Sequence, residues 1–362
     1  MNLTKVLRPY FIRRLSALDR ANADVEATQK RVLRELVGRA RNTLWGREHS
    51  FRSIAGYDDF TSRLNVTPYD QLRPLVMRMI AGEKNLLWPG LTLRYAQSSG
   101  TSDGKSKYIP VTADSLRLNH YRGSADVVAR YLGLYPDSRI FSGRSFILAG
   151  SFANELNLPT HTRTRVGDLS ANLIEAMNPL ANLVRIPSKE IALMQDWHTK
   201  LPALIEAASR ANVTNISGVP SWFLTVLQGI LHATGAKEIH EVWPNLEVFF
   251  HGGISFLPYR SQYDAIIDPS RMHYLETYNA SEGFFAVQND FKDKSMLLII
   301  DRDIFYEFIP VDGDDPTPRT IWEVNTGDVY ELVISSSNGL WRYHLGDTVR
   351  VTQTSPVKIR IA

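Results

Sequence analysis

Short apolar runs that stop abruptly at small and polar residues recur along this chain, and they restrict its possible folds more than any other feature. The run 246–250 is followed directly by His-Gly-Gly at 251–253, and the run 272–277 by Tyr-Asn-Ala-Ser-Glu-Gly at 278–283. Apolar runs of this length, bounded by glycine and polar residues, are typical of strands. Longer segments with helical periodicity separate such runs, so the sequence predicts an α/β fold whose ligands bind at strand ends.

Helices are predicted over roughly the first 60 residues and over 113–131, 189–210 and 221–232. The stretch 1–20 has no acidic residue before Asp19, and taken alone it looks like a basic targeting peptide or a nucleic-acid-binding arm. An apolar stripe continues at helical spacing through 32–37, which favours a solvated amphipathic helix instead. Neither nucleic acid nor a membrane is therefore an expected partner.

Composition excludes several classes of protein. Of the 362 residues, 44% are hydrophobic and 22% are charged, as in a chain with a buried core rather than a disordered, collagen-like or coiled-coil protein. The longest aliphatic run, 296–300, is far shorter than the roughly 20 residues that cross a bilayer. The absence of cysteine excludes disulfides and cysteine-ligated metal sites. Because the chain also begins without an apolar signal stretch, its expected location is cytoplasmic.

Two hairpins are predicted in the last quarter of the chain. The apolar runs 296–300 and 305–309 are separated by Asp-Arg-Asp at 301–303, and the runs 329–335 and 340–344 flank Asn338-Gly339. Short polar connections between apolar runs are hairpin signals, and Asn-Gly is the strongest of them.

The most informative segment is 98–107, Ser-Ser-Gly-Thr-Ser-Asp-Gly-Lys-Ser-Lys, which lies between strand-like runs at 91–96 and 107–111. Small residues let backbone N–H groups approach an anion, while hydroxyl groups and lysine add donors and positive charge. Its end resembles a Walker A loop, and residues 100–104 match the G-x-S-x-G nucleophile elbow. Both motifs must open a helix, whereas 108–110 reads as a strand. A triphosphate-binding loop between antiparallel strands therefore competes with a hairpin tip that binds nothing.

A third motif, Trp-Arg-Tyr-His-Leu-Gly-Asp at 341–347, also follows an apolar run. Taken singly, Gly252 and Gly253 are more often a turn, Glu282 a solvated acid and Asp347 a turn residue. Together the motifs supply phosphate donors, room for a flat base, one carboxylate for a metal ion and one for a ribose. The combination predicts a nucleotide site.

The motifs at 98–107, 278–283 and 341–347 resemble, in order, the nucleotide-binding motifs of the auxin-responsive acyl acid amido synthetases. These enzymes are also called the GH3 family and belong to the adenylate-forming enzymes; bacterial members fit this chain better than plant members. The resemblance runs from about residue 50 to the end, with a departure at Asn279 and Ala280. It implies the large N-terminal domain of adenylate-forming enzymes, with mixed β-sheets flanked by helices and a β-barrel-like subdomain.

The resemblance also implies an activity. ATP and Mg²⁺ would convert a carboxylic acid into an acyl-adenylate with release of pyrophosphate, and an amino acid would then attack the adenylate to give an amide. The catalytic residues would be Lys105 and Glu282, with Glu282 also the Mg²⁺ ligand. The nucleotide-binding residues would be Ser98, Ser99, Gly100, Thr101, Ser102, Gly104, Gly252, Gly253, Tyr278, Ala280, Ser281, Tyr343 and Asp347.

The acyl pocket is less visible in the sequence. Its expected apolar walls are Tyr121, Trp222, Phe223, Phe284 and Phe285, although aromatic residues near helix starts more often belong to the core. No metal ion other than Mg²⁺ is expected, because the histidines lack metal-ligand spacing.

Two alternatives remain open. An acid–CoA ligase shares the first step and differs in its acceptor. A non-catalytic nucleotide-binding module would bind ATP without chemistry, against which the intact Lys105, Glu282 and Asp347 argue.

The resemblance gives an expected domain organisation. Residues 1–60 would form a helical segment packed on an adenylation domain that spans 61–362. Members of the family continue into a smaller C-terminal domain that serves the amide-forming step. That domain is expected to be missing from this chain, which alone would bind ATP and form the adenylate.

Overall fold

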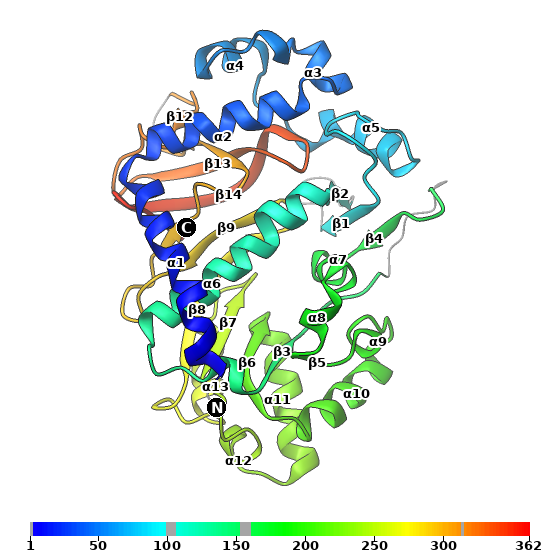
Figure 1. Cartoon of the computed structure of the whole chain (residues 1–362), viewed down its shortest axis with the longest axis vertical. Coiled ribbons are helices and arrows are strands. Elements are labelled where there is room, and N and C mark those ends of the chain that lie inside the picture. The colour runs from blue at the N-terminus through cyan, green and yellow to red at the C-terminus, as the bar shows by residue number, and fades with distance from the viewer. Residues whose placement is uncertain (1–2, 99–105, 153–160, 313–314) are drawn as a thin grey trace.

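A computed structural model of the chain describes residues 3–98, 106–152, 161–312 and 315–362. One twelve-stranded sheet runs through this part of the protein, a separate three-stranded sheet lies beside it, and helices pack along both (Figure 1). Mixed sheets flanked by helices confirm the predicted α/β class.

The large sheet changes from parallel to antiparallel along its width. Five strands from the middle of the chain pair in parallel, because helical segments connect them, and the other neighbours pair antiparallel. The β-barrel-like subdomain stays a prediction; among the described residues the strands of the large sheet run from β12 (Arg319–Thr320) at one edge to β5 (Arg185–Ile186) at the other. The full order is β12 (Arg319–Thr320), β11 (Ile304–Pro310), β13 (Val329–Ser336), β14 (Leu340–Thr354), β15 (Val357–Ile361), β10 (Met296–Leu298), β9 (Gly283–Gln288), β8 (His273–Ala280), β7 (Val248–Gly252), β6 (Val213–Gly218), β3 (Arg144–Ile147) and β5 (Arg185–Ile186).

The small sheet decides between the interpretations of the Ser/Gly-rich segment. It contains β2 (Lys107–Pro110), β1 (Arg94–Ser98) and β4 (Arg165–Gly167) in that order. Strands β1 and β2 are antiparallel, with Ser98 opposite Lys107. A Walker A loop or a nucleophile elbow would lead into a helix, so this strand pairing excludes both.

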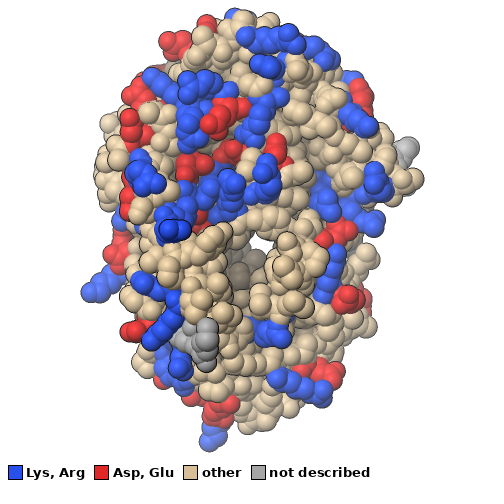
Figure 2. Space-filling view, in the orientation of Figure 1, with Lys and Arg blue, Asp and Glu red and all other residues tan. Residues whose placement is uncertain are grey.

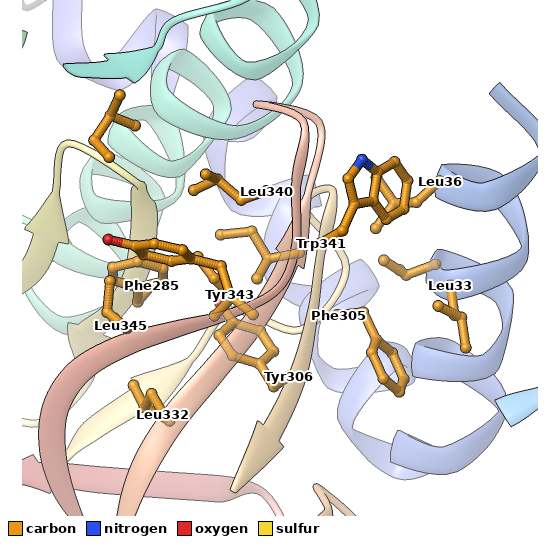
Figure 3. Close-up of a cluster of buried hydrophobic side chains, with 14 of the residues drawn as sticks. Leu33, Leu36, Phe285, Phe305, Tyr306, Leu332, Leu340, Trp341, Tyr343 and Leu345 are labelled. Atoms are coloured by element: carbon orange, nitrogen blue, oxygen red, sulfur yellow. The ribbon is translucent and has the colours of Figure 1, made fainter. Parts of the chain in front are cut away.

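The predicted helical start of the chain is confirmed. Its amphipathic stripe is buried: Leu33 and Leu36 of α2 (Val25–Ala40) face Trp341 of β14, and Phe305 of β11 lies in the same cluster (Figure 3). The apolar spacing therefore fixes which side of α2 lies on the sheet. The helices of this region are α1 (Leu3–Ala23), α2 (Val25–Ala40), α3 (Leu44–Glu48), α4 (Tyr57–Arg63) and α5 (Tyr69–Ile80).

Two of the later helices differ from their predicted form. The helix expected over 113–131 begins as a π-helical segment, Ser115–His120, before α6 (Tyr121–Leu134). The helix expected over 189–210 is split, because the Asp196 carboxylate accepts hydrogen bonds from two backbone N–H groups and starts a new helix there. The helices beyond α6 are α7 (Leu169–Ala176), α8 (Pro179–Asn182), α9 (Lys189–Ala192), α10 (Trp197–Ser209), α11 (Pro220–Thr234), α12 (Ile239–Val242) and α13 (Arg260–Asp264). No helix among the described residues is both long and apolar enough to cross a membrane.

The hairpin predicted from the runs 296–300 and 305–309 is wrong. Strand β10 pairs with β9 and β15, whereas β11 pairs with β12 and β13, so the connection crosses from one part of the sheet to another. Because β10 and β11 do not pair, the backbone groups near their connection need other hydrogen-bond partners. The buried Gln29 side chain of α2 supplies three of these bonds. It donates to Ile300 O and Ile304 O at 2.6 and 2.9 Å and accepts from Tyr306 N–H at 2.9 Å.

Charges fix the same connection to the helices. Arg14 of α1 contacts Asp301 at 2.6 Å and Asp126 of α6 at 2.8 Å, and Arg302 contacts Asp126 at 3.0 Å. Figure 2 shows basic and acidic side chains interleaved over this face of the molecule. The charges at 301–303 that suggested an exposed turn are thus partners for helices distant in sequence.

Candidate functional site

The second and third motifs meet through a hydrogen bond between side chains. The Tyr278 hydroxyl on β8 donates to Asp347 Oδ2 on β14 at 2.5 Å. Burial, and then the negative charge of Asp347, raise the pKa of Tyr278 well above its usual value. Tyr278 therefore remains a protonated donor and holds one oxygen of the carboxylate.

Glu282 is the second carboxylate at this place. It lies with Ser281 in the two-residue turn between β8 and β9, and only 7% of it is exposed. Burial raises the pKa of Glu282 to about 7, and the charge of Asp347 acts in the same direction. The positive charge of Lys107 and a hydrogen bond with Tyr343 oppose this rise. Among the described residues no ion pair neutralises Glu282, so this buried carboxylate is suited to receive a cation.

Lys107 of β2, for which the motifs alone predict no role, joins the first motif to the other two. Its Nζ lies 3.4 Å from the Tyr343 hydroxyl, and its charge acts on Glu282. The β1–β2 register could have identified this lysine, because directly opposed residues share a face of the sheet and Lys107 stands opposite Ser98. Two lysines, one in the loop and one at its base, are therefore candidates for phosphate contacts.

The tip of the first motif lies outside the described residues. The structure places the base of the loop, with Ser98 half-buried at the end of β1. The phosphate-binding roles of the tip residues remain predictions. They are Ser99, Gly100, Thr101, Ser102, Gly104 and Lys105.

Gly252 stands where two parallel strands end side by side. A Cβ at this position would lie 2.3 Å from Thr277 O of β8, so no side chain fits without moving the backbone. The Thr277 hydroxyl donates to His251 O at 3.1 Å and fixes the two strand ends together. Gly253 follows with a φ of +83°. The backbone at Gly252 and Gly253 therefore has no side chain above it, and Gly252 pairs with Thr277, the residue before Tyr278. A flat adenine base needs such an open surface. Ala280, the last residue of β8, is half-buried.

A buried ion pair positions Tyr343. Arg342 has a φ of +42°, rare for a residue other than glycine, and its guanidinium contacts the fully buried Glu307 at 2.7 Å. Tyr57 of α4 also donates to Glu307, at 2.8 Å, and Thr67 N–H donates to Arg342 O at 2.7 Å. Tertiary contacts thus hold the unusual backbone that precedes Tyr343.

The five residues predicted to line the acyl pocket do not form one cluster. Phe223 and Phe285 are fully buried in two different cores, and Phe284 belongs to a third. Trp222, at the start of α11, is 48% exposed. Tyr121 is half-buried, and its hydroxyl donates to a backbone oxygen of α7 at 2.8 Å. Their role as pocket walls remains a prediction.

Clustered metal ligands are absent from the part of the chain that the structure describes. No group of three or more histidine, aspartate or glutamate side chains there could hold a metal ion. Magnesium that binds together with phosphates needs only one or two protein carboxylates and retains several waters. The buried carboxyl of Glu282 fits such a role, because a cation would compensate the charge that burial disfavours.

The pKa of Glu282 predicts a pH-dependent stability. Its folded pKa of about 7 exceeds the value of 4.5 for a free side chain, so its contribution to stability is full below pH 4.5 and is lost as pH rises through 7. We expect Glu282→Gln to gain up to roughly 3 kcal/mol relative to the wild type between pH 4.5 and 8. Urea unfolding of both proteins across this pH range measures the gain. The exposed Glu35→Gln is the control, and a gain no larger than the control's would contradict the assigned environment.

The sequences of known proteins give an independent comparison. The GH3 family N-terminal domain matches residues 14–272, and the GH3 family central domain matches residues 297–362. Indole-3-acetic acid-amido synthetase GH3.4 of Arabidopsis thaliana is 23% identical over 94% of this chain and 67% of its own length. Indole-3-acetic acid-amido synthetase GH3.8 of Oryza sativa subsp. indica is 25% identical over 94% of this chain and 66% of its length. The chain spans about two thirds of these relatives.

Solved structures share the fold. GH3.15 acyl acid amido synthetase, solved in complex with 2,4-DB, matches with a TM-score of 0.79 and 19% identity, over 96% of this chain and 69% of that one. A 2-hydroxyisobutyryl-CoA ligase, solved with 2-HIB-AMP and CoA, matches with a TM-score of 0.61 and 12% identity, over 91% and 66%. The fold is that of adenylate-forming enzymes. The family matches cover most of the chain, including the motifs at 98–107 and 341–347, and by this evidence the chain belongs to the GH3 family.

Proposed function

We propose that this chain uses ATP and Mg²⁺ to activate a carboxylic acid as an acyl-adenylate, which is then conjugated to an amino acid. The observation that carries the proposal is the convergence of Lys107, Glu282 and Asp347, from three motifs far apart in sequence. The names of the GH3 relatives support an amide product.

The proposed first step is a displacement at phosphorus. A carboxylate oxygen of the acid attacks the α-phosphorus of ATP, a new P–O bond forms, and the bond to pyrophosphate breaks with its electron pair leaving on pyrophosphate. Both reactants are anions, so the site must neutralise charge and hold them in line. Lys107 and the loop 98–105 would contact phosphates, and Asp347 would accept hydrogen bonds from ribose hydroxyls. Magnesium, held by Glu282, would neutralise phosphate charge when bound.

The acceptor separates this proposal from its nearest alternative. A CoA ligase shares the fold and the adenylate, as the likeness to a 2-hydroxyisobutyryl-CoA ligase illustrates. Family membership favours an amino acid as the acceptor here. We further propose that residues 61–362 form the adenylation domain and that residues 1–60 cover one side of its sheet (Figure 1).

Ribose recognition by Asp347 can be tested with a nucleotide that lacks one hydroxyl. The wild type is expected to bind ATP about tenfold or more tightly than 2′-deoxy-ATP, because a hydrogen bond to a charged group is worth about 1.5–3 kcal/mol. Asp347→Asn should bind ATP more weakly and lose most of this preference. Calorimetric titration of both proteins with both nucleotides measures it. Equal discrimination by the two proteins would show that the aspartate serves only the strand.

A further inference from the structure

The Asn-Gly turn that predicted the β13–β14 hairpin is buried instead of exposed. The hairpin is confirmed, with three turn residues, 337–339, between the two strands. Ser337 and Asn338 are each only 1% exposed, and Thr112 Oγ1 donates to Ser337 O at 2.7 Å. A Cβ on Gly339 would lie 2.7 Å from Leu87 Cβ. Hairpin turns usually face solvent. The burial of this turn therefore needs an explanation from its contacts with the rest of the protein.

The backbone does not explain the asparagine. Asparagine is favoured in two-residue hairpin turns because it tolerates positive φ. In this turn Gly339 has a φ of +85°, whereas Asn338 keeps a negative φ that most residues adopt. The choice of asparagine therefore depends on its side chain.

The Asn338 carboxamide reaches the candidate site. Its Nδ2 donates to Glu282 O at 2.7 Å, across 56 residues of sequence. Its Oδ1 is buried without a hydrogen-bond partner among the described residues, which costs free energy that an apolar side chain would avoid. Packing alone therefore does not favour this residue, and its bond to the Glu282 peptide is the contact that distinguishes it.

A second buried asparagine fixes the other side of the same turn. Asn119, 2% exposed at the end of the π-helical segment, accepts from Phe284 N–H at 2.7 Å and donates to Phe284 O at 3.2 Å. It also donates to Arg302 O at 2.9 Å. The two asparagines thus hold the backbone at Glu282 and two residues beyond it.

We propose that Asn338 and Asn119 are positioning residues that fix the Glu282 carboxylate for Mg²⁺ bound with ATP. The inference rests on the proposed function and assigns it two further residues. Neither side chain needs to touch the nucleotide. Asn338 holds the peptide group of Glu282, and Asn119 holds Phe284 at the start of β9, so together they limit where the carboxylate can lie. Groups that support a metal ligand in this way typically contribute 10- to 100-fold to metal affinity or activity.

The test is the Mg²⁺ dependence of ATP binding, measured by calorimetry at a series of Mg²⁺ concentrations. The proteins are the wild type, Asn338→Ala, Asn119→Ala and a control, Asn325→Ala, whose exposed side chain donates to Asp328 at 3.2 Å, away from Glu282 in sequence. We expect Asn338→Ala and Asn119→Ala to need about tenfold more Mg²⁺ for half-maximal effect, while ATP binding without Mg²⁺ stays unchanged. The control should match the wild type.

Different outcomes identify which idea is wrong. If the wild type binds Mg²⁺–ATP and both variants show the same Mg²⁺ dependence with only a lower melting temperature, the asparagines are structural and the inference is overturned. If the wild type shows no Mg²⁺-dependent binding of ATP, the proposed function fails and this inference fails with it. Should Asn338→Ala not fold, Asn338→Ser, a residue common in turns, gives the same comparison.

Discussion

Replacing Asp126 by alanine is expected to lower the free energy of unfolding by about 3–5 kcal/mol. Asp126 is 1% exposed on α6 and accepts hydrogen bonds from Arg14 at 2.8 Å and from Arg302 at 3.0 Å. Removal of the carboxylate leaves two partly buried guanidinium groups with too few negative partners. The loss is large because it loosens α1 and the connection between β10 and β11 together.

Urea unfolding followed by circular dichroism measures this loss. The control is Glu26→Ala, which removes an exposed i,i+4 pair with Lys30 on α2 and should cost 0.5 kcal/mol or less. A loss for Asp126→Ala no larger than that of the control would contradict the packing of the N-terminal helices described here.

Replacing Lys105 by alanine is expected to weaken ATP binding, and with it ATP-dependent activity, by about 10- to 150-fold while leaving the fold intact. An ionic contact to phosphate is worth about 1.5–3 kcal/mol, and a lysine in the connection between two hairpin strands contributes little to packing. Lys107→Ala should show a similar loss, because its charge also acts on Glu282. ATP titration by calorimetry measures both variants beside the exposed control Lys84→Ala. Unchanged ATP affinity in both variants would contradict the proposal that Lys105 and Lys107 contact the phosphates of ATP.

The same loop permits a test of the excluded hydrolase. If Ser102 were a nucleophile, Ser102→Ala would abolish an esterase activity of the wild type. A synthetase has no esterase activity to lose. Measurable hydrolysis of activated esters by the wild type, lost in the variant, would contradict the account.

Local pattern was sufficient for much of this fold and for part of the site. The strand character of 107–111 was enough to argue against a Walker loop, and the pairing of β1 with β2 confirms the argument. The stripe of α2 gave its buried face. These features depend on residues a few positions apart, so the spacing of apolar residues in the sequence is enough to predict them.

Features that depend on distant partners could not be predicted in this way. The charged residues 301–303 predicted a turn, because the local sequence does not show their partners. Arg14 pairs with Asp301, and Asp126 pairs with Arg302. No local pattern distinguishes Lys107, because its role depends on Tyr343 and Glu282, which are distant in sequence. The aromatic residues chosen as pocket walls are separated into different cores, because an apolar side chain serves a core and a pocket equally well.

The measurement that tests the central claim most directly is acid-dependent exchange of labelled pyrophosphate into ATP. Formation of an acyl-adenylate is reversible, so an adenylating protein returns label from pyrophosphate to ATP only when Mg²⁺ and a suitable acid are both present. We expect exchange with at least one acid from a panel of aromatic and fatty acids, and its loss in Glu282→Gln. Binding of ATP without exchange for any acid of the panel would contradict the account and indicate a nucleotide-binding module.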